Sequence, residues 1–207
     1  MSDLTKNKKK KFFTTRNMVS CAMLAACATI LMFIEFSTPI APSFYKFDLS
    51  EIPVLIGAFT MGPLAGVVIE LIKVFVHFLI KGSETMGVGE LSNFVLGCIY
   101  VVPAALIYKR KKTKGNAILS LVIGGVAMSV LATIINAFVM IPLYATVFNL
   151  STESIIAMGS AIFPFIDNMF KFCLVCVLPF NIIKVFVVSA ITVLIYKPLS
   201  VLIKGLN

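Results

Sequence analysis

Asn181 and Lys184 lie one helical turn apart within an apolar stretch that covers residues 172–196. An ionisable side chain inside a membrane segment costs several kcal/mol, so it usually faces a polar cavity with a function. Side chains at this spacing share one face of a helix. An ammonium group donates hydrogen bonds, and an amide both donates and accepts them. The pair therefore predicts a pocket for a polar small molecule that carries carbonyl, imide or hydroxyl groups.

Asn136 is expected to face the same pocket from another helix. A helix over residues 117–142 would place it in the outer third of the membrane, at the depth of Lys184, because each residue rises about 1.5 Å. The alternative for Asn136 is a hydrogen bond between helices, which membrane bundles commonly use.

The segment before Pro53 mixes aromatic and polar side chains and is expected to cap the pocket, because aromatic rings can pack on a flat ligand. The alternative is an aromatic belt at the level of the lipid headgroups. The candidate ligand contacts in this segment are Tyr45, Phe47, Asp48 and Leu49.

A second polar group lies on the predicted helix 63–80, where Glu70, Lys73 and His77 are spaced so that neighbours can touch. Intramembrane acids, bases and histidines can form proton relays. An internal ion pair between Glu70 and Lys73 is the preferred interpretation. His77 is the only histidine, so no histidine cluster is available to bind a metal, and no metal site is predicted.

These side chains belong to a strongly apolar chain of 207 residues, with 59% hydrophobic residues and a mean hydropathy of +1.03. Uncharged stretches of about 18 residues or more can cross a bilayer as helices. The sequence therefore predicts an all-α, polytopic membrane protein. No P-loop, GxSxG or HExxH motif is present in the sequence, so we expect a protein that is not an enzyme.

Basic residues set the expected topology. They cluster in a leader, residues 1–16, and again at residues 109–114. Because basic residues favour the cytoplasmic side, these clusters predict that both termini are cytoplasmic. The same pattern accounts for the net charge of +9 without nucleic acid as a partner. Residues 17–207 are expected to form a single transmembrane substrate-binding domain in the plasma membrane.

The chain must cross the membrane an even number of times between the two basic clusters. The apolar region 52–80 contains Gly62-Pro63, which predicts a break between a helix over 51–61 and another over 63–80. The first would rise only about 16 Å, too short for a core of about 30 Å. The loop 37–50 must then enter the protein. The result is a six-helix bundle.

Five sequence stretches resemble the riboflavin-specific S components, the substrate-binding subunits, of energy-coupling-factor (ECF) vitamin transporters. They are KFDLSEIP at 46–53, GPLAG at 62–66, GVGELSNF at 87–94, Asn136 with IPLY at 141–144, and PFNIIK at 179–184. The resemblance implies high-affinity capture of riboflavin as transported ligand, with no cofactor. It also implies a transmembrane coupling protein and two ATPase subunits as partners.

The resemblance also assigns roles to particular residues. It implies ligand contacts at Asn136, Asn181, Lys184 and, less directly, Tyr45 and Gly87, and it implies contact with the coupling protein at Ala22 and Ala26. The latter two form a small-xxx-small step, which permits close helix packing. Three alternatives stay open: uptake of another flat heterocycle such as thiamine, a lipid-acting membrane enzyme, and a purely structural subunit.

Overall fold

The computed structural model describes residues 14–83 and 85–204. The predicted leader lies almost wholly outside this range, as do the basic residues Lys6 to Lys11, and so does Glu84. Five described segments are long and apolar enough to cross a membrane. They are α1 (Thr15–Phe33), α3 (Pro63–Lys81), α4 (Val88–Arg110), the run α5–η1–α6 (Lys114–Ile135, Asn136–Met140, Ile141–Phe148), and the run α8–η2–α9 (Met169–Phe172, Cys173–Val177, Leu178–Lys204). With the short α2 (Glu51–Met61), they confirm the predicted six-helix bundle.

Local sequence signals define several helix ends. The Thr14 hydroxyl accepts a hydrogen bond from the Asn17 amide at the start of α1, and the Thr113 hydroxyl accepts one from the Asn116 amide at the start of α5. Both are ordinary N-caps. Gly62 separates α2 from α3 with a φ of 109°, a conformation that favours glycine, and α3 begins at Pro63. The predicted break at Gly62-Pro63 is confirmed.

The short helix lies inside the protein, and the end of its preceding loop enters the protein, as predicted. Residues 51–59 of α2 are all buried. The loop before it forms a small antiparallel hairpin of β1 (Phe36–Ser37) and β2 (Lys46–Phe47), with Phe36 opposite Phe47. This hairpin was not predicted. Asp48 and Ser50, which follow it, are only 2% and 1% exposed.

The fifth helix differs from the prediction. The helix expected over 117–142 continues to Phe148, and a further helix, α7 (Thr152–Ser160), follows it. Pro142 does not end the helix because it lies in the first turn of α6, directly after the π-helical segment η1. Local π turns allow proline within membrane helices.

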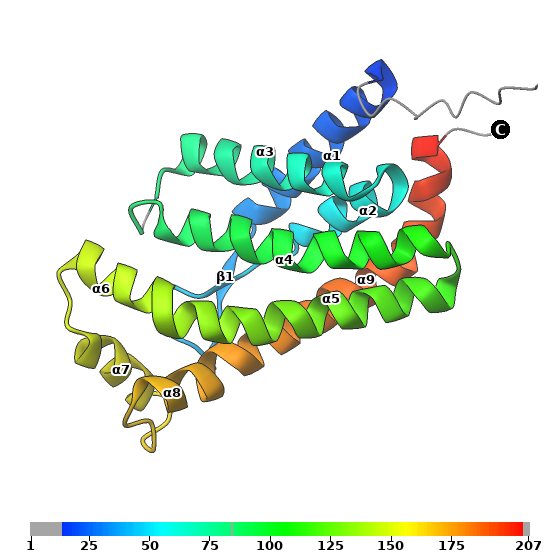
Figure 1. The fold of residues 1–207 in the computed structure, drawn as a ribbon. Coiled ribbons are helices and arrows are strands. Elements are labelled where there is room, and N and C mark those ends of the chain that lie inside the picture. Colours follow the sequence, from blue (N-terminus) through cyan, green and yellow to red (C-terminus); the bar gives the residue numbers. More distant parts are fainter. Residues whose placement is uncertain (1–13, 84, 205–207) are drawn as a thin grey trace, which may run out of the picture.

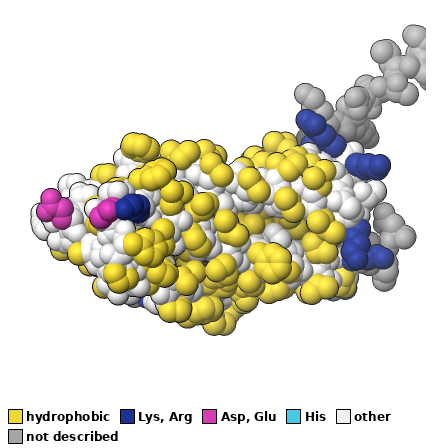
Figure 2. Space-filling model, turned by 90° about the horizontal axis from the view of Figure 1, so that it is seen from below, with side chains coloured by type: hydrophobic (Ala, Val, Ile, Leu, Met, Phe, Trp, Pro, Cys, Tyr) yellow, Lys and Arg dark blue, Asp and Glu magenta, His cyan; other side chains and the backbone are white. Residues whose placement is uncertain are grey.

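The two ends of the bundle carry opposite charge. The start of α1, the α4–α5 connection and the last turn of α9 lie at one end (Figure 1). Lysines and arginines gather at that end of the visible face, whereas the aspartates and glutamates seen in this view lie at the opposite end, next to a Lys or Arg side chain (Figure 2). Between them the surface of α1 and of α3–α5 exposes many large hydrophobic side chains, as a lipid-facing surface should. We refer below to the basic end and the acidic end.

Candidate functional site

A cavity lies in the acidic half of the bundle and is bounded by the ends of α1 and α3, the β-hairpin loop, and the facing sides of α4, η1 and α9. It encloses about 960 Å³ of empty space, including its open mouth. The aromatic side chains that line it are Phe44, Tyr45, Tyr144 and Phe180.

Asn136 lies in the cavity wall at the first residue of the π-helix η1. Its Nδ2 donates to the carbonyl oxygen of Ala132 at 2.8 Å, and its Oδ1 accepts from the Tyr45 hydroxyl at 2.8 Å. Burial raises the pKa of Tyr45 well above its usual value, so the phenol stays a donor. The loop is thereby attached to the helix that carries Asn136.

Asn181 faces the cavity from α9, one turn after the second π-helix, η2. Its Nδ2 donates to the carbonyl oxygen of Val177, the last residue of η2, at 2.8 Å. Single π turns inside helices frequently occur at functional sites, where they change the direction in which side chains project. Here each of the two π-helices lies within one turn of a cavity-lining asparagine.

Lys184 lines the same cavity, and its ammonium group already has a carboxylate partner within the protein. Its Nζ pairs with Asp48 Oδ2 at 2.8 Å, and the two side chains are 7% and 2% exposed. Burial alone would raise the pKa of Asp48, but the ammonium groups of Lys184 and Lys73 and the Ser50 hydrogen bonds together lower it to about 2. Lys184 therefore touches both the cavity and an internal carboxylate.

Four of the predicted ligand contacts do not line the cavity. Asp48 lies behind Lys184, and Phe47 packs against Phe36 and Phe180 with ring centroids 5.1 and 6.4 Å apart. Leu49 packs against the two hydrophobic clusters of the core. Gly87 starts α4 with a φ of 88°. These residues therefore shape the loop and the start of α4 around the cavity: Phe47 and Leu49 by packing, Asp48 by its ion pair, and Gly87 by its backbone conformation.

Several polar residues of the cavity wall were not predicted as ligand contacts, among them Glu51, Asn93 and His77. Asn93 lies on α4 between Gly89 and Gly97, which also line the cavity. The spacing of four residues places these three positions on one face of the helix, and it could have predicted that Asn93 faces the cavity. Glu51 gave no such signal, because its burial depends on the loop entering the protein.

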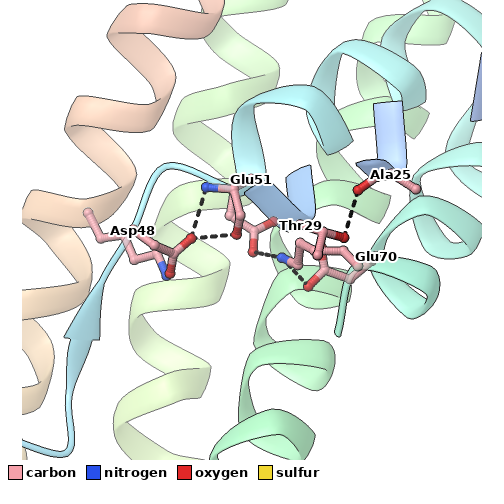
Figure 3. A network of polar contacts seen from close by, with 8 residues as sticks. Ala25, Thr29, Asp48, Glu51 and Glu70 are labelled. Atoms are coloured by element: carbon pink, nitrogen blue, oxygen red, sulfur yellow. Dashed lines mark hydrogen bonds and ion pairs between the residues drawn. The ribbon is translucent and has the colours of Figure 1, made fainter. Parts of the chain in front are cut away.

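Two groups of buried ion pairs lie between α9 and α3: Lys184 with Asp48, and Lys73 with Glu51 and Glu70 (Figure 3). Lys73 Nζ lies 2.9 Å from Glu51 Oε1 and 2.7 Å from Glu70 Oε1. The predicted Glu70–Lys73 ion pair is confirmed. Neither ring nitrogen of His77 has a hydrogen-bond partner among the described residues. Over the same residues, no group of three or more His, Cys, Asp or Glu is arranged to hold a metal ion.

Ala22 and Ala26 lie on a surface of α1 that is separate from the cavity. Both are exposed, whereas Cys21, Ala25 and Ala28 are buried on a different side of the same helix. The small-xxx-small step therefore faces away from the bundle and does not serve packing within it.

Comparison with known proteins agrees with this architecture. The family model of the ECF transporter substrate-specific component matches residues 16–196. The riboflavin transporter RibU of Staphylococcus aureus (strain TCH60) is 33% identical over 190 residues, 91% of this chain and 93% of the relative. The riboflavin transporter FmnP of Bacillus subtilis (strain 168) is 30% identical over 187 residues, 89% of this chain and 92% of the relative.

A solved S component of a bacterial ECF transporter superposes with a TM-score of 0.71 at 30% identity, covering 92% of this chain and 98% of the solved one. The resemblance that the sequence motifs indicated is confirmed. With its apolar helices, the chain is a multi-pass bacterial membrane protein. It belongs to the family of substrate-specific components of ECF transporters.

Proposed function

We propose that this chain binds riboflavin at the outer side of the membrane and presents it to an energising module for ATP-driven uptake. Two relatives that are 33% and 30% identical over most of their length are named riboflavin transporters. The observation that carries the proposal is the cavity in which Asn136, Asn181 and Lys184 form one polar wall beside aromatic rings.

The chemistry of riboflavin suits this wall. The vitamin has a flat tricyclic ring with an imide edge and a ribityl chain. Lys184 donates a hydrogen bond to a ring carbonyl, and Asn181 forms a hydrogen bond with the same imide edge. Asn136 forms a hydrogen bond with a polar part of the ligand. Phe180 and the Tyr45 ring line the cavity and offer apolar surface to the ring system. In this proposal Phe47, Asp48, Leu49 and Gly87 act indirectly, by holding the loop and the start of α4.

The direction of transport follows from charge. Basic residues favour the cytoplasmic side of a membrane. The basic end, with the start of α1 and the last turn of α9, is therefore cytoplasmic in our proposal, and the cavity at the acidic end opens outward. Riboflavin is cargo in this scheme and not a cofactor, and the chain acts as a binding subunit rather than as an enzyme.

The energy source lies in partner subunits. The chain has no P-loop motif, so ATP must be hydrolysed elsewhere. We propose that a transmembrane coupling protein with two ATPase subunits supplies it, and that Ala22 and Ala26 are the point of contact. Both are exposed on a membrane-spanning helix, and small residues let a partner helix approach closely.

Titration of the purified full-length protein in detergent tests the proposal. Riboflavin fluorescence should be quenched on binding, and protein isolated from riboflavin-fed cells should show flavin absorbance. Thiamine, added as competitor, should not restore the fluorescence. Saturable binding of thiamine with no quenching of riboflavin would assign the site to another heterocycle and contradict the proposal.

A further inference from the structure

One carboxylate oxygen at the floor of the cavity has no hydrogen-bond donor. Glu51 is 4% exposed and lines the cavity. Its Oε1 is paired with Lys73 at 2.9 Å, whereas its Oε2 has no hydrogen-bond partner among the described residues. A buried charged oxygen without a donor is unfavourable by several kcal/mol unless something else supplies one. Such an atom beside a binding cavity is positioned to accept a hydrogen bond from the ligand.

The surrounding cluster holds too few cations to satisfy its acids. Within the buried ion pairs of Figure 3, the carboxylates Asp48, Glu51 and Glu70 share the ammonium groups of Lys73 and Lys184. Lys184 is bound to Asp48 at 2.8 Å, and Lys73 lies between the two glutamates. Among the described residues, no contact of either ammonium group reaches Glu51 Oε2.

Glu51 lines the same cavity as Lys184 and Asn181, the groups that are proposed to read the ring carbonyls. Asp48 accepts from the Ser50 amide at 2.8 Å and pairs with Lys184 at 2.8 Å, so Glu51 is the next residue along this chain of contacts. Gly97 lines the cavity beside it. A Cβ at Gly97 would lie 3.2 Å from Glu51 Oε1 and 2.5 Å from Glu70 Oε1, so the missing side chain leaves room for both carboxylates beside α4.

We propose that Glu51 determines ligand specificity: its Oε2 accepts the hydrogen bond of the imide N–H that stands between the two ring carbonyls. An imide edge presents acceptor, donor, acceptor in a row. Lys184 and Asn181 donate to the acceptors, and Glu51 takes the donor between them. Lys73 keeps the carboxylate in place through Oε1. The inference rests on the proposed function and names the part of the ligand that the site recognises.

The imide N–H can be removed from the ligand without changing the ring system. N3-methylriboflavin lacks this donor, so the wild-type protein should bind it at least about tenfold more weakly than riboflavin, a difference of about 1.4 kcal/mol. Equal affinities would overturn the inference. This arm needs no variant, and therefore does not depend on whether a substituted protein folds.

A matched pair of substitutions separates direct contact from the electrostatics of the cluster. Glu51→Ala removes the acceptor, so the preference for riboflavin over N3-methylriboflavin should fall to within about threefold. Glu70→Ala removes the same charge from Lys73, but Glu70 is not part of the cavity lining, so the preference should persist. A preference that survives in Glu51→Ala, or that disappears in both variants, would overturn the inference.

These measurements distinguish the inference from the proposed function. If the wild-type protein does not bind riboflavin at all, the proposed function fails. If it binds riboflavin tightly but tolerates the N3-methyl group, only the role of Glu51 fails. Lumiflavin, which keeps the imide and lacks the ribityl hydroxyls, serves as the control ligand, and its affinity should fall in Glu51→Ala by the same factor as that of riboflavin.

Discussion

Lys184 has two partners in our account, the ligand and Asp48, and substitution can separate them. Lys184→Met keeps most of the side-chain volume and removes the ammonium group. Asp48 would then be a carboxylate that is 2% exposed, with Ser50 as its remaining hydrogen-bond donor. Removing one partner of a buried ion pair costs about 3–5 kcal/mol. At about 2–4 °C per kcal/mol for a chain of this size, the apparent melting temperature should fall by roughly 6–20 °C.

The double variant Lys184→Met/Asp48→Asn removes both charges. Replacing both members of a buried pair by neutral groups is often close to neutral for stability, so the melting temperature of the ligand-free protein should recover most of the loss. Riboflavin affinity should not recover. It should stay at least about tenfold below wild type in both variants, a loss of about 1.4 kcal/mol, because the donor to the ring carbonyl is missing.

Thermal unfolding in detergent and riboflavin fluorescence quenching, measured on the same preparations, provide the two readouts. If the double variant regains wild-type affinity together with stability, Lys184 serves only to hold the loop, and its assignment as a ligand contact is wrong. If Lys184→Met is as stable as wild type, the ion pair with Asp48 does not carry the stability that its burial implies.

Three further outcomes are expected. Tyr45→Phe removes the hydroxyl that donates to Asn136. Because such a hydrogen bond contributes about 0.5–1.5 kcal/mol, riboflavin binding should weaken by up to about tenfold. An unchanged titration would contradict a role for this contact. Ala22→Leu or Ala26→Leu should abolish uptake by cells while the purified protein still binds riboflavin; normal uptake would place the coupling contact elsewhere. Because the pKa of Asp48 is lowered from 3.8 to about 2, its ion pair stabilises the fold fully above about pH 4 and loses about 2 kcal/mol as the pH falls towards 2. Acid unfolding curves of wild type and Asp48→Asn should differ in that window, and identical curves would refute this linkage.

Much of the architecture follows from the sequence, because a bilayer restricts what a chain can do. Apolar length sets the number of spans, and Gly62-Pro63 sets the break between α2 and α3. The parity of crossings between two basic clusters led to a loop that enters the protein, which the burial of Asp48 and Ser50 confirms. An amine and two amides in apolar helices indicated the cavity wall at Asn136, Asn181 and Lys184. Each of these arguments uses a cost that depends on depth in the membrane and not on neighbouring side chains.

The partners of these polar groups were decided only by tertiary structure. No helical period relates Asp48 to Lys184, 136 residues apart, or Tyr45 to Asn136, 91 residues apart. The π-helices that precede Asn181 and begin at Asn136 depend on local packing, and no sequence period predicts them. Glu51 illustrates the difference most clearly. Only the entry of the loop into the bundle buries this acid in the cavity wall, because burial arises from the arrangement of distant segments.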